Sequence, residues 1–272
     1  MNSKIQNVGY IKNNIYNESF IPYSSNCDVH ANVNLDWIFE VVQEVAATHA
    51  TILNSSIFDL QKIGLTWVIS REKIDIYKYP KWREKVIVET WAQKPYRRVL
   101  VPRIIQAKNS DGELLFKATT LWAIIDLKTQ RPIEPDKILD VFGFPKVTKD
   151  EKFYIHKRDI INDENHIISK RKPNINYSDT DFNHHVNNIS YVRWALRSMP
   201  NDYRNDYKIK SVDVSWLKQT FLNDNVEIVT TSEDLNALQK NNATFYHKLV
   251  RQDNLGKNTS VFEAKSVWEK SN

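Results

Sequence analysis

An α+β fold in which one helix-and-sheet unit occurs twice is predicted by three observations: a repeated order of elements, a repeated closing motif and two amphipathic helical stretches. In each half of the chain, a helical stretch is followed by strands in which apolar and polar residues alternate with a period of two. The last strand of each half contains Ala-x-[Thr/Ser]-[Leu/Val]-Trp, at residues 118–122 and 264–268. A helix that is apolar over most of its surface is best buried by a sheet that curves around it. We therefore expect a tandem (double) hot-dog fold, each repeat a long helix wrapped by a curved antiparallel sheet.

The helix of the first half is predicted to begin after Asn34, because asparagine is a favoured N-cap residue. Its apolar residues follow the i, i+3, i+4, i+7 spacing of one helix face. They are Leu35, Ile38, Val41, Val42, Val45 and Ala46. In the second half, Asn187 or Asn188 is expected to cap the equivalent helix, and Pro200 lies beyond its end.

Antiparallel strands are predicted after each helix. In the first half they lie at residues 73–76, 85–91, 100–108 and 114–125, and in the second half at 211–217, 225–230, 244–252 and 260–269. Turns rich in Asx and glycine join the last two strands of each half, at residues 109–112 and 253–256. The frequent β-branched and aromatic residues of these segments favour strands.

Three segments are predicted along the chain: an N-terminal hot-dog domain at residues 1–135, a linker at 136–167 and a C-terminal hot-dog domain at 168–272. The linker prediction rests on prolines and mixed charges after the first repeat, with one short helix near residues 137–141. A structureless segment of this length is uncommon inside a compact domain, so we expect it to run over the surface between domains.

Composition excludes several classes of protein. A chain of 272 residues with 41% hydrophobic and 11% aromatic residues builds a sizeable core, which excludes wholesale disorder. Neither GxGxxG nor GxxxxGK[ST] occurs, so no nucleotide cofactor is expected. Cys27 is the only cysteine and no run of 18 apolar residues occurs, so we expect a cytoplasmic protein. The net charge of +5 fits either a solvated surface or an acidic partner.

The densest polar cluster, residues 177–188, lies just before the second helix. A helix N-terminus offers free backbone N–H groups and the positive end of the helix dipole, which stabilise a developing oxyanion. In an extended segment, Asp181, Asn183 and His185 fall at i, i+2 and i+4 and point to one side. A carboxylate, an amide and an imidazole are the components of acyl hydrolysis. The same residue types are common in turns and caps, so local capping is an equally supported interpretation.

Two other chemistries fit this cluster less well. Asp179, Asp181, His184 and His185 are plausible metal ligands, but adjacent histidines in a strand point to opposite faces. No second His/Cys cluster completes such a site, so no metal is expected. A Ser-His-Asp triad is disfavoured because no G-x-S-x-G motif is present.

Residues 179–194, DTDFNHHVNNISYVRW, closely resemble the D-x-D-x-N-x-H-V-N-N-x-x-Y-x-x-W signature of acyl-(acyl carrier protein) thioesterases. Segments 65–71, 79–82, 88–91 and 118–131 are similar to the first hot-dog domain of that family. The resemblance covers residues from about 19 to 268, and without a plant-type extension it is to a bacterial form. It implies a thioester hydrolase that acts on acyl-acyl carrier protein and releases free fatty acid in fatty acid biosynthesis.

Carried over by position, Asp181, Asn183 and His185 match catalytic residues of that family. Gln219, 34 residues beyond the histidine, stands where the family has a further catalytic glutamate, and Thr220 stands where plant members often have cysteine. A neutral amide orients a water but does not accept its proton. Either Asp181 with His185 supplies the base, or the protein is a catalytically weak or inactive acyl-binding protein.

The first helix carries Gln43, Glu44, Thr48 and His49, but no Asp-x-Asn-x-His precedes it, so the first domain is expected to be non-catalytic. The resemblance implies that this domain holds the acyl chain between helix and sheet. The candidates for lining the tunnel are Trp37, Ile38, Val41, Val42 and Ile69. An apolar stripe at helical spacing is also typical of plain core.

The resemblance further implies an acidic acyl carrier protein as the partner. The basic runs at residues 170–172 and 97–98 are candidates for docking it by electrostatic steering, although charges at strand ends are often simply solvated. Nucleic acid is not expected as a partner because no RNP, zinc or OB signature occurs. No membrane partner is expected, and a homodimer remains open.

Overall fold

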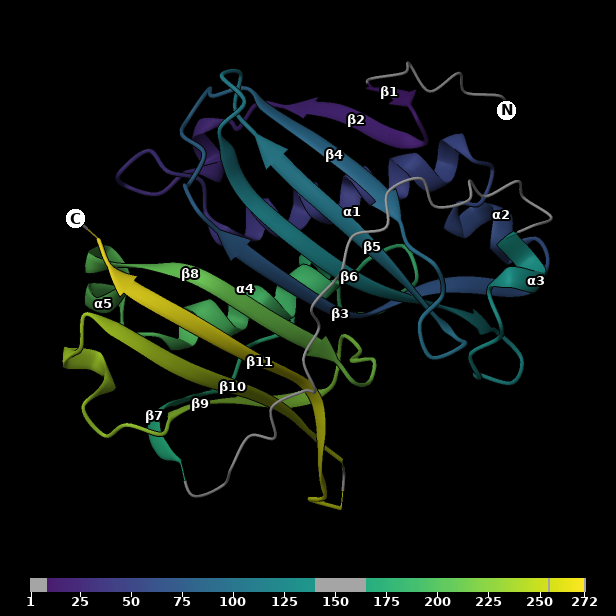
Figure 1. The fold of residues 1–272 in the computed structure, drawn as a ribbon. Helices are drawn as coiled ribbons and strands as arrows, with labels where there is room; N and C mark the ends of the chain where they lie inside the picture. Colours follow the sequence, from purple (N-terminus) through teal and green to yellow (C-terminus); the bar gives the residue numbers. More distant parts are fainter. Residues whose placement is uncertain (1–8, 140–164, 254, 272) are drawn as a thin grey trace. The chain divides into compact units, whose positions relative to one another are not determined.

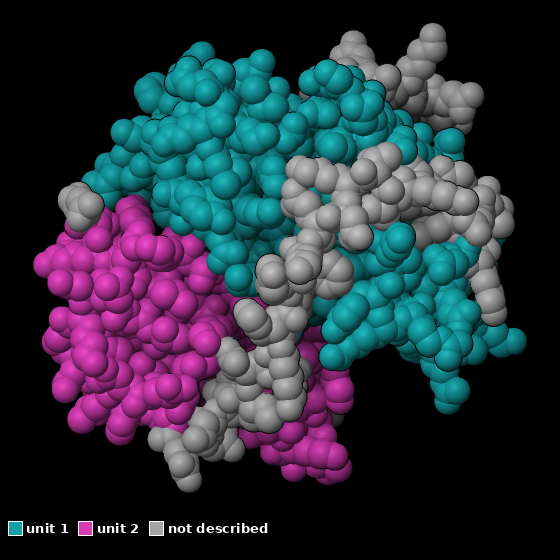
Figure 2. All heavy atoms as spheres, viewed as in Figure 1, with its two compact units in different colours: residues 1–155 teal, residues 156–272 magenta. Residues whose placement is uncertain are grey.

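The computed structural model describes residues 9–139, 165–253 and 255–271, and the chain divides into two compact units, Met1–Ile155 and His156–Asn272 (Figure 2). In each unit a long helix lies against a curved antiparallel sheet (Figure 1). This arrangement confirms the predicted α+β tandem hot-dog fold.

The first unit is built from six described strands and three described α-helices. They are β1 (Gly9–Lys12), β2 (Ile15–Phe20), α1 (Leu35–Ile52), α2 (Ile57–Gln61), β3 (Leu65–Ile76), β4 (Val86–Ala92), β5 (Leu100–Lys108), β6 (Leu114–Asp126) and α3 (Asp136–Leu139). The strand order is β1-β2-β4-β5-β6-β3, antiparallel throughout. The helix α1 begins after Asn34, as predicted, and all six apolar residues predicted for its inner face are buried.

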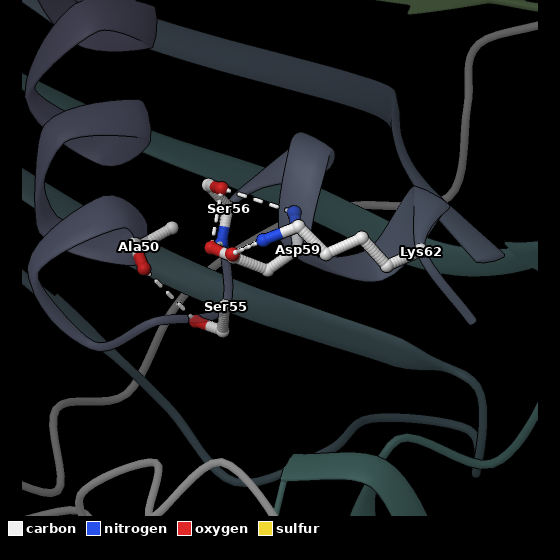
Figure 3. A network of polar contacts seen from close by, with 5 residues as sticks. All are labelled: Ala50, Ser55, Ser56, Asp59 and Lys62. Carbon is white, nitrogen blue, oxygen red and sulfur yellow. Dashed lines mark hydrogen bonds and ion pairs between the residues drawn. The ribbon is translucent and has the colours of Figure 1, made fainter. Parts of the chain in front are cut away.

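A small polar network joins α1 to α2 (Figure 3). The Ser55 hydroxyl donates to the carbonyl of Ala50 over 3.2 Å. The Ser56 hydroxyl accepts from the backbone N–H of Asp59 over 3.2 Å, and the Asp59 carboxylate accepts from the Ser56 N–H over 3.1 Å. Lys62 adds an ion pair to Asp59 at 2.9 Å. This capping box fixes the start of α2, a helix too short to give a periodic hydrophobic pattern.

The second unit repeats the arrangement. Its elements are β7 (His166–Arg171), α4 (Asn188–Ser198), α5 (Asn201–Asp206), β8 (Tyr207–Trp216), β9 (Asn225–Ser232), β10 (Asn242–Gln252) and β11 (Asn258–Lys270). The strand order is β8-β11-β10-β9-β7, again antiparallel. Asn187 caps α4, because its side-chain oxygen accepts from the N–H of Ile189 over 2.9 Å. Of the two cap candidates, Asn187 is therefore the one used.

The repeated closing motif makes the same side-chain bond in both units. The indole N–H of Trp122 donates to the hydroxyl of Thr120, and the indole N–H of Trp268 donates to the hydroxyl of Ser266, each over 2.8 Å. The register is also repeated, because Phe116 on β6 pairs with the last residue of β3 and Phe262 on β11 pairs with the last residue of β8. Positions in the two units can therefore be matched one by one.

Three strands escaped the sequence patterns. β1, β2 and β7 lie at or near a sheet edge. β1 and β7 carry many exposed residues, and β2 has three consecutive buried residues, so none of the three shows a clear alternation. β7 begins at His166, inside the segment expected to be linker, and β3 begins at Leu65, eight residues before the predicted strand. The short helix expected near residues 137–141 corresponds to α3, and residues 140–164 of the expected linker lie outside the described residues.

Candidate functional site

The three predicted site residues of the second unit lie in a backbone-closed loop just before α4. The N–H of Asp181 donates to the carbonyl of His185 over 2.9 Å, and the N–H of His184 donates to the carbonyl of Asp181 over 3.0 Å. The N–H of Asn187 donates to the carbonyl of Asp179 over 2.7 Å, which ties the loop to the first residue of the signature. The loop is therefore held by its own backbone at the N-terminus of a helix.

The extended conformation expected for this segment is wrong. Residues 182–185 form turns and bends, and His184 has a left-handed φ of 61°. The Asp181 carboxylate accepts the N–H of Asn183 over 2.8 Å, as in an Asx turn. The alternation of side chains along a strand therefore does not bring Asp181, Asn183 and His185 together. Instead, the hydrogen bond between the backbones of Asp181 and His185 brings these residues close together.

A second segment joins this loop from the end of β8. The N–H of Val186 donates to the carbonyl of Thr220 over 2.8 Å, so the neighbours of His185 and Gln219 are bonded to each other. The ring of Phe221 meets the His185 imidazole edge-on, with centroids 5.2 Å apart. The segment that contains Gln219 therefore lies beside the loop. This is the arrangement expected if Gln219 occupies the position of the glutamate in the family resemblance.

Solvent reaches most of this site. Asp181, Asn183 and His185 are half-buried, and Gln219 and His184 are exposed. The Gln219 carbonyl accepts from the Arg251 guanidinium over 2.9 Å, and the same Nη1 atom lies 3.1 Å from the carboxylate of Asp224. Arg251 therefore fixes the backbone that carries the Gln219 side chain.

Beneath the loop the second unit is aromatic. Tyr191 on α4 lies against Trp194 and against Phe262 of β11, with centroids 5.7 and 5.6 Å apart. Burial raises the pKa of the Tyr191 phenol to about 12, so this group is neutral at physiological pH. The phenol is thus a packing and hydrogen-bonding group rather than an acid.

The residues predicted to line an acyl tunnel lie in the interior of the first unit. Trp37, Ile38, Val41 and Val42 on α1 and Ile69 on β3 are all buried. Burial is what both a core and a lined tunnel require, so the role of these five side chains in binding stays a prediction.

A loop with the same backbone bonds precedes α1, and the sequence analysis did not detect it. The N–H of Asp28 donates to the carbonyl of Asn32 over 2.7 Å, and the Asp28 carboxylate accepts the N–H of His30 over 2.9 Å. The N–H of Val33 donates to the carbonyl of Pro80 over 2.9 Å, which matches the bond from Val186 to Thr220.

This first loop carries Asp, His and Asn where the second carries Asp, Asn and His. The spacing from Asp28 to Val33-Asn34 equals that from Asp181 to Val186-Asn187. This shared spacing is the signal in the sequence that could have revealed the first loop.

No metal cluster of three or more His, Cys, Asp or Glu side chains occurs within the described ranges. In the same ranges no helix is long and apolar enough to cross a membrane.

Two family models match the chain in succession. The model of the acyl-ACP thioesterase N-terminal domain matches residues 13–141, and that of the acyl-ACP thioesterase C-terminal domain matches residues 162–270. The chain belongs to the acyl-ACP thioesterase family. The predicted resemblance is thereby confirmed over both repeats.

The curated relatives of this family member include plant thioesterases. It is 28% identical over 238 residues to the chloroplastic oleoyl-acyl carrier protein thioesterase 2 of Arabidopsis thaliana, covering 81% of this chain and 64% of that protein. It is 23% identical over 235 residues to the chloroplastic palmitoyl-acyl carrier protein thioesterase of Gossypium hirsutum, covering 82% and 56%. The chain thus spans less than two thirds of the length of these relatives.

Solved structures share the fold. An acyl-ACP thioesterase from Bacteroides thetaiotaomicron matches with a TM-score of 0.77 at 24% identity, covering 94% of this chain and 98% of that chain. The 12:0-ACP thioesterase from Umbellularia californica matches with a TM-score of 0.83 at 19% identity, covering 96% and 100%. At these identities the likeness establishes the tandem hot-dog fold.

Proposed function

We propose that the protein hydrolyses the thioester of acyl-acyl carrier protein and releases free fatty acid in fatty acid biosynthesis. One observation carries the proposal: the closed loop with Asp181, Asn183 and His185 is bonded to the segment of Gln219 at the N-terminus of α4. Membership of the acyl-ACP thioesterase family supports the choice of substrate.

In this mechanism the thioester carbonyl is polarised by Asn183 and by backbone N–H groups at the start of α4. Asp181 or His185 takes a proton from the attacking water, whose oxygen forms the new bond to the carbonyl carbon. The carbon–sulfur bond then breaks, and the thiolate leaves with assistance from His185. A thiol with a pKa near 8.5 leaves readily, so modest acid assistance suffices.

Gln219 orients the water in this proposal and leaves the proton to the other residues. This assignment predicts that Gln219→Glu, which adds a second proton acceptor beside His185, raises kcat. Unchanged or lower turnover in that variant contradicts this expectation and leaves proton transfer to Asp181 and His185 alone.

The two units divide the work in this proposal. Residues 1–135 hold the acyl chain, with Trp37 and Ile38 among the lining residues, and residues 168–272 carry the chemistry. An acidic carrier protein is the partner, for which the exposed basic residues at 170–172 are the better docking candidates. Cys27 is the only cysteine of the sequence, and this fits a reducing compartment such as the cytoplasm.

Purified protein and carrier-protein thioesters of graded acyl length test the proposal. We expect hydrolysis of at least one chain length and a loss of about 10³-fold in kcat for His185→Ala. The matched control is His184→Ala, because alanine already occupies the equivalent left-handed position at Ala31, with a φ of 60°. Inertness on every chain length, or equal rates for His185→Ala and the unmodified protein, would remove the hydrolase assignment.

A second function is favoured by Gln219 alone: binding of an acyl chain without turnover. Single-turnover hydrolysis of a radiolabelled acyl thioester separates the two functions. A binding protein retains the label in the thioester at saturating protein, whereas a hydrolase releases it as free acid within one turnover.

A further inference from the structure

A glutamate lies buried inside the first unit. Glu72 on β3 is fully buried, and neither of its carboxyl oxygens has a hydrogen-bond partner among the described residues. Its carboxyl lies close to the amide of Gln43 on α1, and the hydrogen-bonding influence of that amide lowers the carboxyl pKa against the larger, raising effect of burial. Yet the Nε2 of Gln43 is also buried and makes no hydrogen bond within the described part of the chain. The Glu72 carboxyl and the Gln43 amide therefore lie close together, and neither meets the geometry of a hydrogen bond among the described residues.

Leaving such groups unbonded is costly. An unsatisfied buried polar group destabilises a fold, and an ionised carboxylate does so far more strongly. Burial accordingly raises the pKa of Glu72 well above its ordinary range, which favours the protonated form of the carboxyl. In that form it both donates and accepts one hydrogen bond, and Gln43 donates another.

The second unit shows that the fold does not require these residues. Glu72 pairs with Thr120, which pairs with Arg103, and these three define the inner row of the first unit. In the second unit the matched residues are Val212, Ser266 and Phe245, in the same order, and they define its inner row. All six side chains are buried. Counting from the helix caps places Gln43 at the position of Leu196. The acid, the amide and the guanidinium are therefore specific to the first unit.

Arg103 does not neutralise Glu72. Its Nη1 atom lies 3.0 Å from the Nδ1 of His49 on α1 and donates to the hydroxyl of Thr90 on β4 over 3.1 Å, on the far side from β3. Burial and the Arg103 charge lower the pKa of His49 to about 3, so its ring is neutral. The interior of the first unit therefore holds a buried cation and, two strands away, an unbonded acid.

We propose that Glu72 and Gln43 form a recognition site for a hydroxyl group carried on the acyl chain of the substrate. The site rests on the proposed function, in which this unit holds the chain. A hydroxyl is the complementary group because it donates to a carboxyl oxygen and accepts from the Gln43 amide. A positively charged group on the substrate chain is disfavoured because the buried Arg103 already carries a positive charge. A carboxylate on the chain is disfavoured because it would lie against the acid Glu72. The substrate class is hence a hydroxyacyl thioester rather than a plain saturated one.

Hydrolysis of matched substrates by the full chain tests this site. Carrier-protein thioesters of one chain length are compared without a substituent and with one hydroxyl at C3, at mid-chain or at the terminal carbon. For at least one hydroxylated substrate, we expect kcat/KM to exceed that of the unsubstituted chain. Glu72→Val introduces the residue found at the matched position of the second unit. It should lower the ratio of kcat/KM for the hydroxylated substrate over the unsubstituted one by about tenfold, because the hydroxyl then enters an apolar site without a hydrogen bond. Glu72→Gln, which keeps a bonding group, lowers it less.

A second variant and a binding measurement keep the outcomes separate. Gln43→Leu, again the residue of the second unit, is expected to reduce the same ratio and replaces Glu72→Val if that variant does not fold. Calorimetry with the free hydroxylated and unsubstituted fatty acids measures recognition without catalysis. Preference for the hydroxylated acid without any thioester hydrolysis overturns the proposed function but supports the recognition site. A ratio that stays within twofold in both variants, with no binding preference, overturns the recognition site and leaves the hydrolase standing.

Discussion

The two units place different residues on one shared backbone design. Before each helix, a loop is closed by the same bonds, yet the order is Asp, His, Asn in the first unit and Asp, Asn, His in the second. Inside each unit a hydroxyl side chain bonded to tryptophan forms the middle of the inner row, yet its flanks are Glu72 and Arg103 in one and Val212 and Phe245 in the other. The backbone tolerates either set. The polar residues that differ are therefore not required by the shared backbone design, and the proposals above assign them to binding and catalysis.

The largest expected effect separates the two loops. Asp181→Ala and Asp28→Ala each remove a carboxylate that accepts a backbone N–H within its own loop, over 2.8 and 2.9 Å. Asp181→Ala should lose about 1 kcal/mol of stability, as is typical for one such hydrogen bond. Asp28→Ala should lose up to about twice that, because Asp28 also accepts the N–H of Asn32 over 3.0 Å. Only Asp181→Ala should lower kcat, by about 10²–10⁴-fold, because only that loop is assigned to the chemistry.

Steady-state kinetics and urea unfolding on both variants check this pair. A comparable loss of kcat in Asp28→Ala would mean that the first loop contributes to catalysis. Full activity in Asp181→Ala would reduce that carboxylate to a turn-forming residue.

Exchange of residues between the inner rows should give opposite changes in stability. Glu72→Val removes an unbonded buried acid and is expected to raise the free energy of unfolding by about 1–3 kcal/mol. Val212→Glu buries an acid where the second unit has an apolar contact and is expected to lower it by about 3 kcal/mol or more. Urea unfolding monitored by tryptophan fluorescence measures both. A destabilised Glu72→Val variant would show that Glu72 has a structural role.

The same acid makes a prediction about pH. The folded-state pKa of Glu72 lies above its unfolded value, so the folded chain binds more protons in that window. The stability of the unmodified protein should therefore fall as pH rises from about 4.3 towards the raised folded pKa. Relative to Glu72→Gln, the deficit in unfolding free energy should grow as pH rises from about 4.3 towards the raised folded pKa. A constant difference over this range contradicts a buried, titrating acid.

Each unit also contains a buried neutral histidine among its described residues, and these two histidines change stability with pH in the opposite direction. Burial lowers the pKa of His247 to about 4, and His49 is lowered to about 3. The unfolded chain binds protons near pH 6.5 while the folded chain does not, so stability is lost as pH falls below 6.5. At pH 5 each histidine should lower the unfolding free energy by roughly 2 kcal/mol relative to pH 7.5.

Glutamine at either histidine position tests this loss. His49→Gln and His247→Gln should each reduce the difference in unfolding free energy between pH 7.5 and pH 5 by that amount. His247 bonds Thr230 and Ser266, whereas the Nε2 of His49 has no partner in the described residues. The absolute stability should hence drop more for His247→Gln. An unaltered pH dependence in both variants would show that neither ring is excluded from protonation.

The pattern of hydrophobic residues predicted most of the fold, and the reasons for its failures are physical. The predicted bounds of β5 are those observed, because a strand buried on both sides has a strong signal. β7 is exposed at both ends and only half-buried in the middle, and its sequence gave no such signal. In the candidate site the residue types made Asp181 and His185 candidates, whose roles stay predictions, but did not give their conformation. The left-handed turn at His184 depends on backbone bonds that no side-chain periodicity records.

Buried polar residues are harder still to predict. Glu72 stands in a strand that alternates polar and apolar residues, and a bulge between Ile69 and Arg71 shifts the alternation by one. The alternation of Ile74 and Ile76 with polar neighbours places Glu72, two residues before Ile74, on the same inward face. Glutamate is rarely buried, so its residue type points the other way, and the buried position of Glu72 in the structure resolves this conflict.

The smallest expected effect concerns docking of the carrier protein. Alanine at Lys170, Arg171 and Lys172 together should raise KM for a carrier-protein thioester a few-fold at low salt and leave kcat unchanged, because steering acts on encounter. Arg98→Ala should have a weaker effect, since Arg98 already pairs with Glu134. The difference should vanish at high ionic strength, where charges are screened. If KM is insensitive to both salt and these substitutions, the excess of basic residues has no part in recognising the carrier, and the acyl chain alone selects the substrate.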